Sequence, residues 1–318
     1  MTRAFTTKIE RLSDGLHGPW RSPRNLLQAQ TYGGHASVHD DETARKMGFD
    51  AAPIEGPTHF SQFIPLCTEI WGDRWLSEGC LSVSYKGAVL DGEEVMAFIG
   101  IPTGDEQQLP IWMTKRDGSE VLRGTASVGS NAPDSVLQTK LDRLCATDPN
   151  RVIFGHVEPG AVRPRFAARI NFDSPMGDLY PFTLRDKNAN ITEVSAYYEE
   201  GRKTPWGGPI LPVEMISVLA HHRAFEDPWL PRKETIDLFV DQEIRIFAGP
   251  LMVDTEYEIE RTLVALSGSR RTESCWVRSD IYLPTQEKVL ASVLLNVASF
   301  KDSYADYDLE HAKLRGEH

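Results

Sequence analysis

Three histidines and a glutamate lie between positions 35 and 59 and could carry out acid/base chemistry. They are His35, His39, Glu55 and His59. An imidazole can take up or release a proton near neutral pH, whereas a carboxyl group donates a proton there only if its pKa is raised. The segment could therefore hold a proton-transfer site that combines imidazole groups with one carboxyl group.

The same side chains could also bind a metal ion. Two pairs, His35 with His39 and Glu55 with His59, have a spacing of four residues, and imidazole and carboxylate groups are common ligands of zinc and iron. That spacing brings two side chains to one face only in a helix, and the glycines and proline around these residues indicate loops. We therefore expect no metal. No nucleotide-binding glycine motif is present either, and we expect no cofactor.

A repeated phrase indicates how these residues are positioned. Gly56-Pro57 comes before one apolar helical stretch and Gly208-Pro209 before another, and the pairs are 208 − 56 = 152 residues apart in a chain of 318. A single duplication at this period indicates two homologous domains rather than a solenoid, and the length is sufficient for two cores. We predict an N-terminal domain at 1–147 and a C-terminal domain at 148–318, with a linker over about 130–165.

Each half is expected to contain one buried helix followed by strands. Apolar residues from Phe60 to Trp71 recur at spacings of three and four, which is typical of a helix buried along one face, and the second such helix runs through Val213 to Ala220. Strands are expected at 81–85, 95–101, 111–113, 121–128, 236–240, 244–247, 256–265, 275–283 and 289–299. Short helices are expected at 40–47 and 192–198, and a third at 135–145 in the linker. The segment before Leu26 is a polar leader, and the tail from Tyr304 is expected to fray.

The segment between Gly33 and Gly56 resembles the MaoC-like branch of the hotdog superfamily, which includes the type 2 (R-specific) enoyl-CoA hydratases and related dehydratases. That branch carries Gly-Asp-x-Asn-Pro-x-His, then an acid, Ala and Gly-Phe, and finally Ile-x-His-Gly at the start of the central helix. The matching residues here are His39, Asp40 or Asp41, Ala44, Gly48-Phe49, Pro53-Ile54 and Gly56. The resemblance implies an α+β fold of two tandem hotdog domains, each a long central helix wrapped by an antiparallel sheet.

The resemblance also implies a reaction, although key positions are changed. In the family, an Asp five residues before the His polarises a water together with that His, and the pair adds water to a trans-2-enoyl thioester or removes it. Here the Asp position is Gly34, the Asn position is Ala36, and the His before the helix glycine is Glu55. Because half of the dyad is missing, we expect His39 to be the principal acid/base, supported by His35 or Glu55.

The remaining expected site residues bind substrate. Backbone N–H groups near Gly56 could polarise a thioester carbonyl, and His59 lies one turn further on. At the 152-residue offset, Gly34 pairs with Asp186 and Ala36 with Asn188, so the second half keeps the Asp-x-Asn that the first half lost. In double hotdogs of this family one half usually carries the dyad and the other helps to bind the acyl or CoA tail, so we expect Asp186 and Asn188 to bind substrate. Asp186 could equally fix its own loop.

Composition restricts the partners. A formal charge of −12 and a pI near 5.3 argue against nucleic acid or an anionic membrane as the main partner. No stretch approaches the roughly 18 apolar residues of a membrane span, and no signal peptide is recognisable, so a cytoplasmic location is expected. The four cysteines, Cys67, Cys80, Cys145 and Cys275, lie singly and indicate neither a zinc site nor a disulfide framework. Homodimers are common in the resembling family, so a homo-oligomer is expected.

The function that these features favour is hydration or dehydration of an acyl thioester or a similar carbonyl substrate. The substrate would be a small molecule such as an acyl-CoA or a carrier-bound acyl thioester, with proton transfer by His39. A hotdog thioesterase would instead activate water with Glu55. A non-catalytic acyl-binding or assembly subunit would also fit the changed motif.

Overall fold

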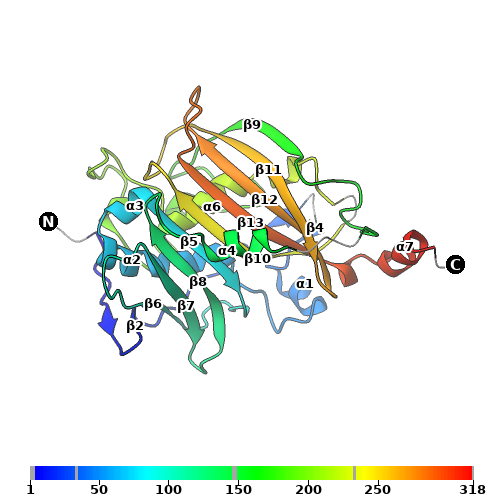
Figure 1. The fold of residues 1–318 in the computed structure, drawn as a ribbon, viewed down its shortest axis with the longest axis horizontal. Coiled ribbons are helices and arrows are strands. Elements are labelled where there is room, and N and C mark those ends of the chain that lie inside the picture. Colours follow the sequence, from blue (N-terminus) through cyan, green and yellow to red (C-terminus); the bar gives the residue numbers. More distant parts are fainter. Residues whose placement is uncertain (1–3, 33–34, 145–148, 232–233, 317–318) are drawn as a thin grey trace.

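The computed structural model describes residues 4–32, 35–144, 149–231 and 234–316, and of residues 35 and 36 only the backbone. In this part of the chain, the main sheet has eleven antiparallel strands in the order β1-β2-β6-β7-β8-β5-β10-β13-β12-β11-β9. Figure 1 shows this sheet running through the whole molecule. From the junction outward, the first half has the order β5-β8-β7-β6 and the second half the order β10-β13-β12-β11. The second half thus repeats the strand order of the first as its mirror image.

The first half contributes β1 (Glu10–Arg11), β2 (Gly15–His17), β5 (Gly79–Tyr85), β6 (Val95–Gly100), β7 (Gln108–Lys115) and β8 (Glu120–Val128). The second contributes β9 (Val162–Ala168), β10 (Asp237–Ile246), β11 (Tyr257–Gly268), β12 (Thr272–Tyr282) and β13 (Ala291–Phe300). A separate pair consists of β3 (Thr31–Tyr32) and β4 (His35–Ala36).

The helices of the first half are α1 (Asp41–Lys46), η1 (Gly56–Phe63), α2 (Ile64–Trp71) and α3 (Arg74–Glu78), and α4 (Val136–Asp142) lies in the linker. The second half has α5 (Leu184–Asn190), η2 (Ala196–Tyr198), α6 (Val213–His221), η3 (Ala224–Glu226), η4 (Lys301–Ser303) and α7 (Tyr307–Leu314). None of the helices in the described ranges combines the length and the apolar character that crossing a membrane requires.

The two halves are joined through their central strands. β5 pairs with β10 in antiparallel register, from Cys80 opposite Arg245 to Ser84 opposite Asp241. This pairing joins the two repeated units into one continuous sheet. Side chains near the junction can therefore contact residues of the other half. The boundary predicted at 147/148 falls within residues 145–148, which lie outside the described residues.

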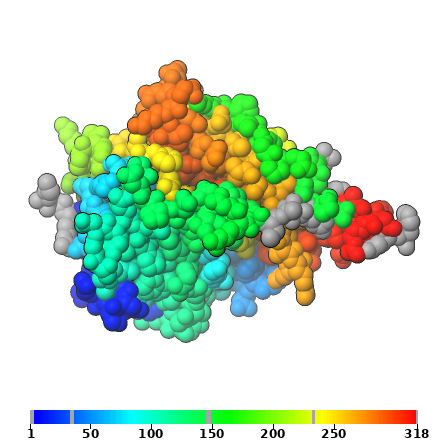
Figure 2. Space-filling view, viewed as in Figure 1, coloured from blue at the N-terminus to red at the C-terminus, as the bar shows by residue number. Residues whose placement is uncertain are grey.

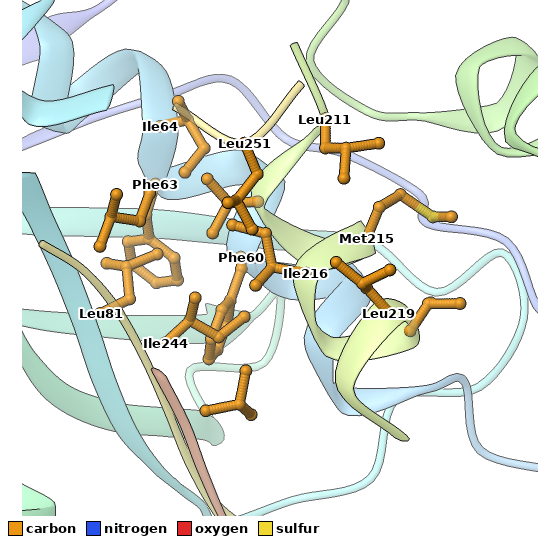
Figure 3. Packing of buried hydrophobic residues seen from close by; sticks show 14 of the residues in the cluster. Phe60, Phe63, Ile64, Leu81, Leu211, Met215, Ile216, Leu219, Ile244 and Leu251 are labelled. Atoms are coloured by element: carbon orange, nitrogen blue, oxygen red, sulfur yellow. The ribbon is translucent and has the colours of Figure 1, made fainter. Parts of the chain in front are cut away.

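The two central helices share one core on the same face of the sheet. η1 continues directly into α2, and both pack with α6 against the sheet; Figure 3 shows Phe60, Phe63 and Ile64 near Ile216 and Leu219. The first three of these side chains are fully buried. The helix predicted from Phe60 to Trp71 is therefore confirmed, but it is buried on all sides from Pro57 to Cys67 rather than along one face only.

Several predicted elements differ from the structure. The strands predicted at 236–240 and 244–247 are one strand, β10, whose register shifts between Phe239 and Asp241, and this irregularity interrupts the alternation. The helix predicted at 192–198 is wrong, because the helix lies at 184–190 and only a short turn, η2, follows. The tail predicted to fray forms α7, which protrudes from the body in Figures 1 and 2.

The repeat offset also differs from the sequence estimate. Pro53 bridges Leu90 in the first half and Ile210 bridges Met252 in the second, so these bridges make Pro53 and Ile210 equivalent, at an offset of 210 − 53 = 157. The two Gly-Pro pairs are therefore five residues out of register, and Gly208-Pro209 precedes α6 without starting it.

The linker helix α4 packs over the junction between the halves and contacts both β5 and β10. It lies in front of the sheet in Figure 1, on the face opposite α6, and the linker crosses the middle of the molecule in Figure 2. Asp241 on β10 is fully buried beneath it and accepts hydrogen bonds from Lys140 Nζ at 2.7 Å, from Asn296 Nδ2 at 2.7 Å and from the hydroxyl of Ser84. Because Ser84 belongs to β5, this carboxylate connects both halves and the linker.

We predict that Lys140→Met lowers the free energy of unfolding by about 2 kcal/mol, because the buried carboxylate of Asp241 loses its cation while two hydrogen bonds remain. Urea unfolding of the whole chain measures this effect. Lys46→Met is the matched control, since the Lys46–Glu42 pair is exposed and such pairs contribute less than about 0.5 kcal/mol. Equal losses of unfolding free energy in Lys140→Met and Lys46→Met would show that the Lys140–Asp241 pair does not stabilise the junction.

Candidate active site

A cavity of about 240 Å³ lies at the start of the first central helix and is lined by both halves. The first half supplies the segments 37–39, 53–56 and 86–89, and the second half supplies Tyr180 and the start of β10 at 237–240. Apolar side chains such as Leu27, Phe49 and Phe239 form much of its wall. Cavities of this kind, apolar with a few converging polar groups, are typical ligand sites.

His39 lines this cavity and is held in one orientation. Its Nδ1 lies 2.7 Å from the carbonyl oxygen of Pro53, and its backbone N–H donates to Ser37 Oγ at 3.0 Å. A carbonyl oxygen only accepts, so Nδ1 carries the proton and Nε2 of the neutral ring has a free lone pair. Burial lowers the pKa of His39 to about 4. At neutral pH this ring is therefore a proton acceptor.

Glu55 lines the same cavity immediately before η1 and is 5% exposed. Burial is the main cause that raises its pKa to about 7; the nearby carboxyl of Glu214 also raises it, and Lys187 together with a hydrogen bond from Tyr180 lowers it. Its Oε1 has no hydrogen-bond partner among the described residues. Because the carboxyl keeps its proton up to about neutral pH, Glu55 can act as an acid where an ordinary glutamate cannot.

A lysine of the second half lies beside this carboxyl. Lys187 Nζ is 4.0 Å from Glu55 Oε2, 3.2 Å from Glu214 Oε2 and 3.2 Å from Thr58 Oγ1. Ser61 Oγ donates to the other oxygen of Glu214 at 2.7 Å. Lys187 and Glu214 are 3% and 1% exposed. One ammonium group is thus shared by two buried carboxyl groups, one from each half.

Neither Lys187 nor Glu214 was expected from the sequence. The available signals were a single acid inside an apolar helix, Val213-Glu214-Met215, and a lysine between two residues already selected, Asp186 and Asn188. Buried charged groups are uncommon unless they are paired, so Glu214 in particular required a partner. Its identity depends on the docking of α5, which no local pattern predicts.

Gly56 starts the central helix and also lines the cavity. A Cβ atom at this position would lie 2.5 Å from the ring of Tyr85, so a side chain there would displace that ring. The first N–H groups of a helix have no partner within the helix and carry partial positive charge. Pro57 has no N–H and the N–H of Thr58 donates to the carbonyl of Glu55 at 3.2 Å, so of the N–H groups expected to polarise a carbonyl near Gly56, that of Gly56 itself is the candidate.

The two remaining histidines are placed differently. His59 lines the cavity, is 3% exposed, and has an Nδ1 atom without a hydrogen-bond partner among the described residues. Burial lowers its pKa to about 3, so it is neutral at pH 7. For His35 the structure describes only the backbone, which pairs with Tyr32, and residues 33–34 lie outside the described residues.

Asp186 and Asn188 lie on α5 and are not among the residues that line this cavity. Asp186 is exposed and caps its own helix, because its carboxylate accepts from the backbone and hydroxyl of Thr183. Asn188 Nδ2 donates to the carbonyl of Tyr198. With the offset of 157 residues that holds at Pro53 and Ile210, the position equivalent to Glu55 is Pro212 (55 + 157 = 212). The Asp-x-Asn phrase is thus a helix cap rather than a second copy of the loop.

The described residues include no group of three or more His, Cys, Asp or Glu side chains placed to hold a metal ion. Neither of the two pairs considered as metal ligands, His35 with His39 and Glu55 with His59, lies within one helix. His39 comes before α1, and Glu55 comes before η1.

Comparison with known proteins gives no family model and no curated protein that matches the chain. Solved structures do match. A protein from Chloroflexus aurantiacus J-10-fl, assigned as a MaoC domain dehydratase, is 14% identical with a TM-score of 0.50, over 94% of this chain and 96% of that one. A conserved hypothetical protein from Mycobacterium tuberculosis, described as a double hotdog, is 12% identical with a TM-score of 0.55, over 94% and 97% of the two chains.

These similarities extend over nearly the whole chain and concern the fold. They agree with the mirrored strand order and the paired central helices, and they confirm the predicted α+β architecture of two tandem hotdog domains. The chain is a double-hotdog protein, with the fold of the MaoC-like dehydratases.

Proposed function

We propose that this protein adds water to a 2-enoyl thioester, or removes water from the corresponding 3-hydroxyacyl thioester, in the cavity of its first half. The observation that carries the proposal is that one cavity holds two groups with opposite protonation at neutral pH. His39 is neutral with a free Nε2, and Glu55 keeps its proton up to a pH of about 7. Environments that separate two pKa values in this way identify an acid and a base.

The roles of the side chains follow from these states. In hydration, His39 Nε2 takes a proton from water as the water oxygen bonds to the β-carbon of the substrate. The electron pair of the double bond moves to the α-carbon, which receives the proton of Glu55. The N–H of Gly56 at the start of η1 stabilises the negative charge that develops on the thioester oxygen. Dehydration is the same sequence in reverse.

Lys187 acts on Glu55 rather than on the substrate. Its ammonium bonds Glu214 directly and lies farther from Glu55, at 4.0 Å. Glu55 is thus farther from this cation than Glu214 is, and burial keeps the pKa of Glu55 at about 7. The proposal assigns Lys187 a positioning role, in which it keeps the pKa of Glu55 close to neutral instead of far above it.

We predict that His39→Ala lowers kcat/KM for crotonyl-CoA or longer 2-enoyl thioesters by about 100-fold or more, because the base is lost. Hydration is followed as loss of enoyl absorbance. His222→Ala is a matched control: its Nδ1 also faces a backbone carbonyl, that of Leu219 at 3.0 Å, and burial lowers its pKa to about 4, but it does not line the cavity. Equal rates for His39→Ala and wild type would contradict the proposal and favour a binding role.

The pH dependence of kcat/KM is expected to be bell-shaped. Protonation of His39 below pH about 4 removes the base, and ionisation of Glu55 above pH about 7 removes the acid. Glu55→Gln should lower the rate by at least about tenfold and abolish the decline above pH 7. If the rate instead rises through pH 7 and releases free thiol in a Glu55-dependent manner, Glu55 acts as a base and the protein is a thioesterase.

Substitutions at Lys187 and Glu214 should shift the pH at which kcat/KM declines, here called the high-pH limb, in a defined order. Lys187→Met removes the cation and raises the pKa of Glu55, so the limb moves above its wild-type position; Glu214→Gln moves it below. The double variant should lie between Lys187→Met and wild type, since only burial then raises this pKa. Lys187→Met alone should also cost about 3 kcal/mol of stability, part of which the double variant recovers. A limb at the same pH in all four proteins would show that Lys187 does not control Glu55.

A further inference from the structure

The cavity wall contains three buried polar atoms without a hydrogen-bond partner among the described residues. They are Glu55 Oε1, His59 Nδ1 and Gln30 Oε1. Buried polar atoms are nearly always bonded, and an unpaired atom that faces a cavity indicates a group supplied by the ligand. Glu55 belongs to the reaction proposed above, whereas Gln30 has no part in it.

The orientation of the Gln30 amide is determined by its surroundings. The side chain is 4% exposed, and Nε2 donates to the backbone carbonyl of Leu179 at 2.7 Å. A carbonyl cannot donate, so the nitrogen must face Leu179 and the oxygen must face away from it. Gln30 Oε1 is therefore an unpaired acceptor on a side chain that lines the cavity, where a bound molecule can supply its donor.

Gln30 and Glu55 are connected through consecutive residues of the second half. The backbone of Leu179 holds Gln30, and the hydroxyl of Tyr180 bonds Glu55. The polar part of the wall is thus rigid on both sides of this segment. Apolar side chains that include Leu27, Phe49 and Val89 also line the cavity, together with polar ones such as Ser37 and His39. A purely alkyl chain would fill this space and leave Gln30 Oε1 buried and unpaired, which is unfavourable.

We propose that the acyl group bound here carries a hydroxyl group beyond its two reacting carbons, and that this hydroxyl donates a hydrogen bond to Gln30 Oε1. The inference rests on the proposed function for the identity of the acyl thioester. A neutral amide oxygen suits a neutral donor: a carboxylate on the chain has no proton to donate, and an ammonium group would be costly to bury. Gln30 is then a specificity-determining residue.

The test compares ligands that differ only in this hydroxyl. Pantetheine thioesters of hexanoic acid and of 4-, 5- and 6-hydroxyhexanoic acid share the arm that CoA and carrier proteins have in common, and lack the double bond that would react. Their dissociation constants are measured by calorimetry with wild type, with Gln30→Met and with Gln62→Met. Gln62 is the matched control, because it is equally buried, both its amide atoms lack partners among the described residues, and it does not line the cavity.

We expect at least one hydroxylated thioester to bind wild type about tenfold more tightly than hexanoyl pantetheine, since a site that pairs a hydroxyl rejects the analogue without it. Gln30→Met should abolish that preference, and Gln62→Met should keep it. The inference is overturned if wild type binds no hydroxylated member more tightly than the parent, if it binds none of the four, or if Gln30→Met retains the preference. Should Gln30→Met not fold, the wild-type comparison decides alone. Because binding is measured without turnover, failure of the hydratase reaction remains a separate result.

Discussion

The ammonium group of Lys187 lies between two buried carboxyl groups beside the cavity. It lies 3.2 Å from Glu214 and 4.0 Å from Glu55, and all three side chains are almost excluded from water. Two buried carboxylates with one cation would leave an uncompensated charge in a medium of low polarity, which is costly. The cost is avoided if one carboxyl stays protonated. Lys187 and Ser61 both bond Glu214, whereas burial raises the pKa of Glu55 to about 7, so Glu55 keeps its proton up to about neutral pH.

This arrangement needs both halves of the molecule. Glu55 comes from the first half, while Lys187 and Glu214 come from α5 and α6 of the second. Their distances are set by the β5–β10 pairing, by the packing of η1 against α6, and by the linker helix above Asp241. The second half thus places a lysine and a glutamate beside Glu55 of the first half. At the position equivalent to Glu55, the second half has Pro212, which provides no acid or base.

The fold could be predicted to a large extent because its signals are local. The apolar stripe from Phe60 to Trp71 and the alternating strands depend only on which face is buried, and they reappear as the central helix and β5 to β8. The short strands β1 and β2 and the edge strand β9 were missed. Few of their residues are buried, so they resemble loops, and pairing with other strands makes them regular. The same limit affected the site. His39 and Glu55 could be selected from a local motif, whereas Lys187, Glu214 and Gln30 acquire their roles through partners more than 25 residues away in sequence.

The state of Glu55 can be observed without any substrate. Infrared difference spectra between wild type and Glu55→Gln isolate the carbonyl stretch of this carboxyl group in its protonated form, and a pH titration follows its loss. The structure predicts that the band persists at pH 6 and disappears with a midpoint of about 7. A midpoint near the ordinary value for glutamate, about 4.3, would show that Glu55 is ionised at neutral pH, and the assignment of an acid and a base to this cavity would be wrong.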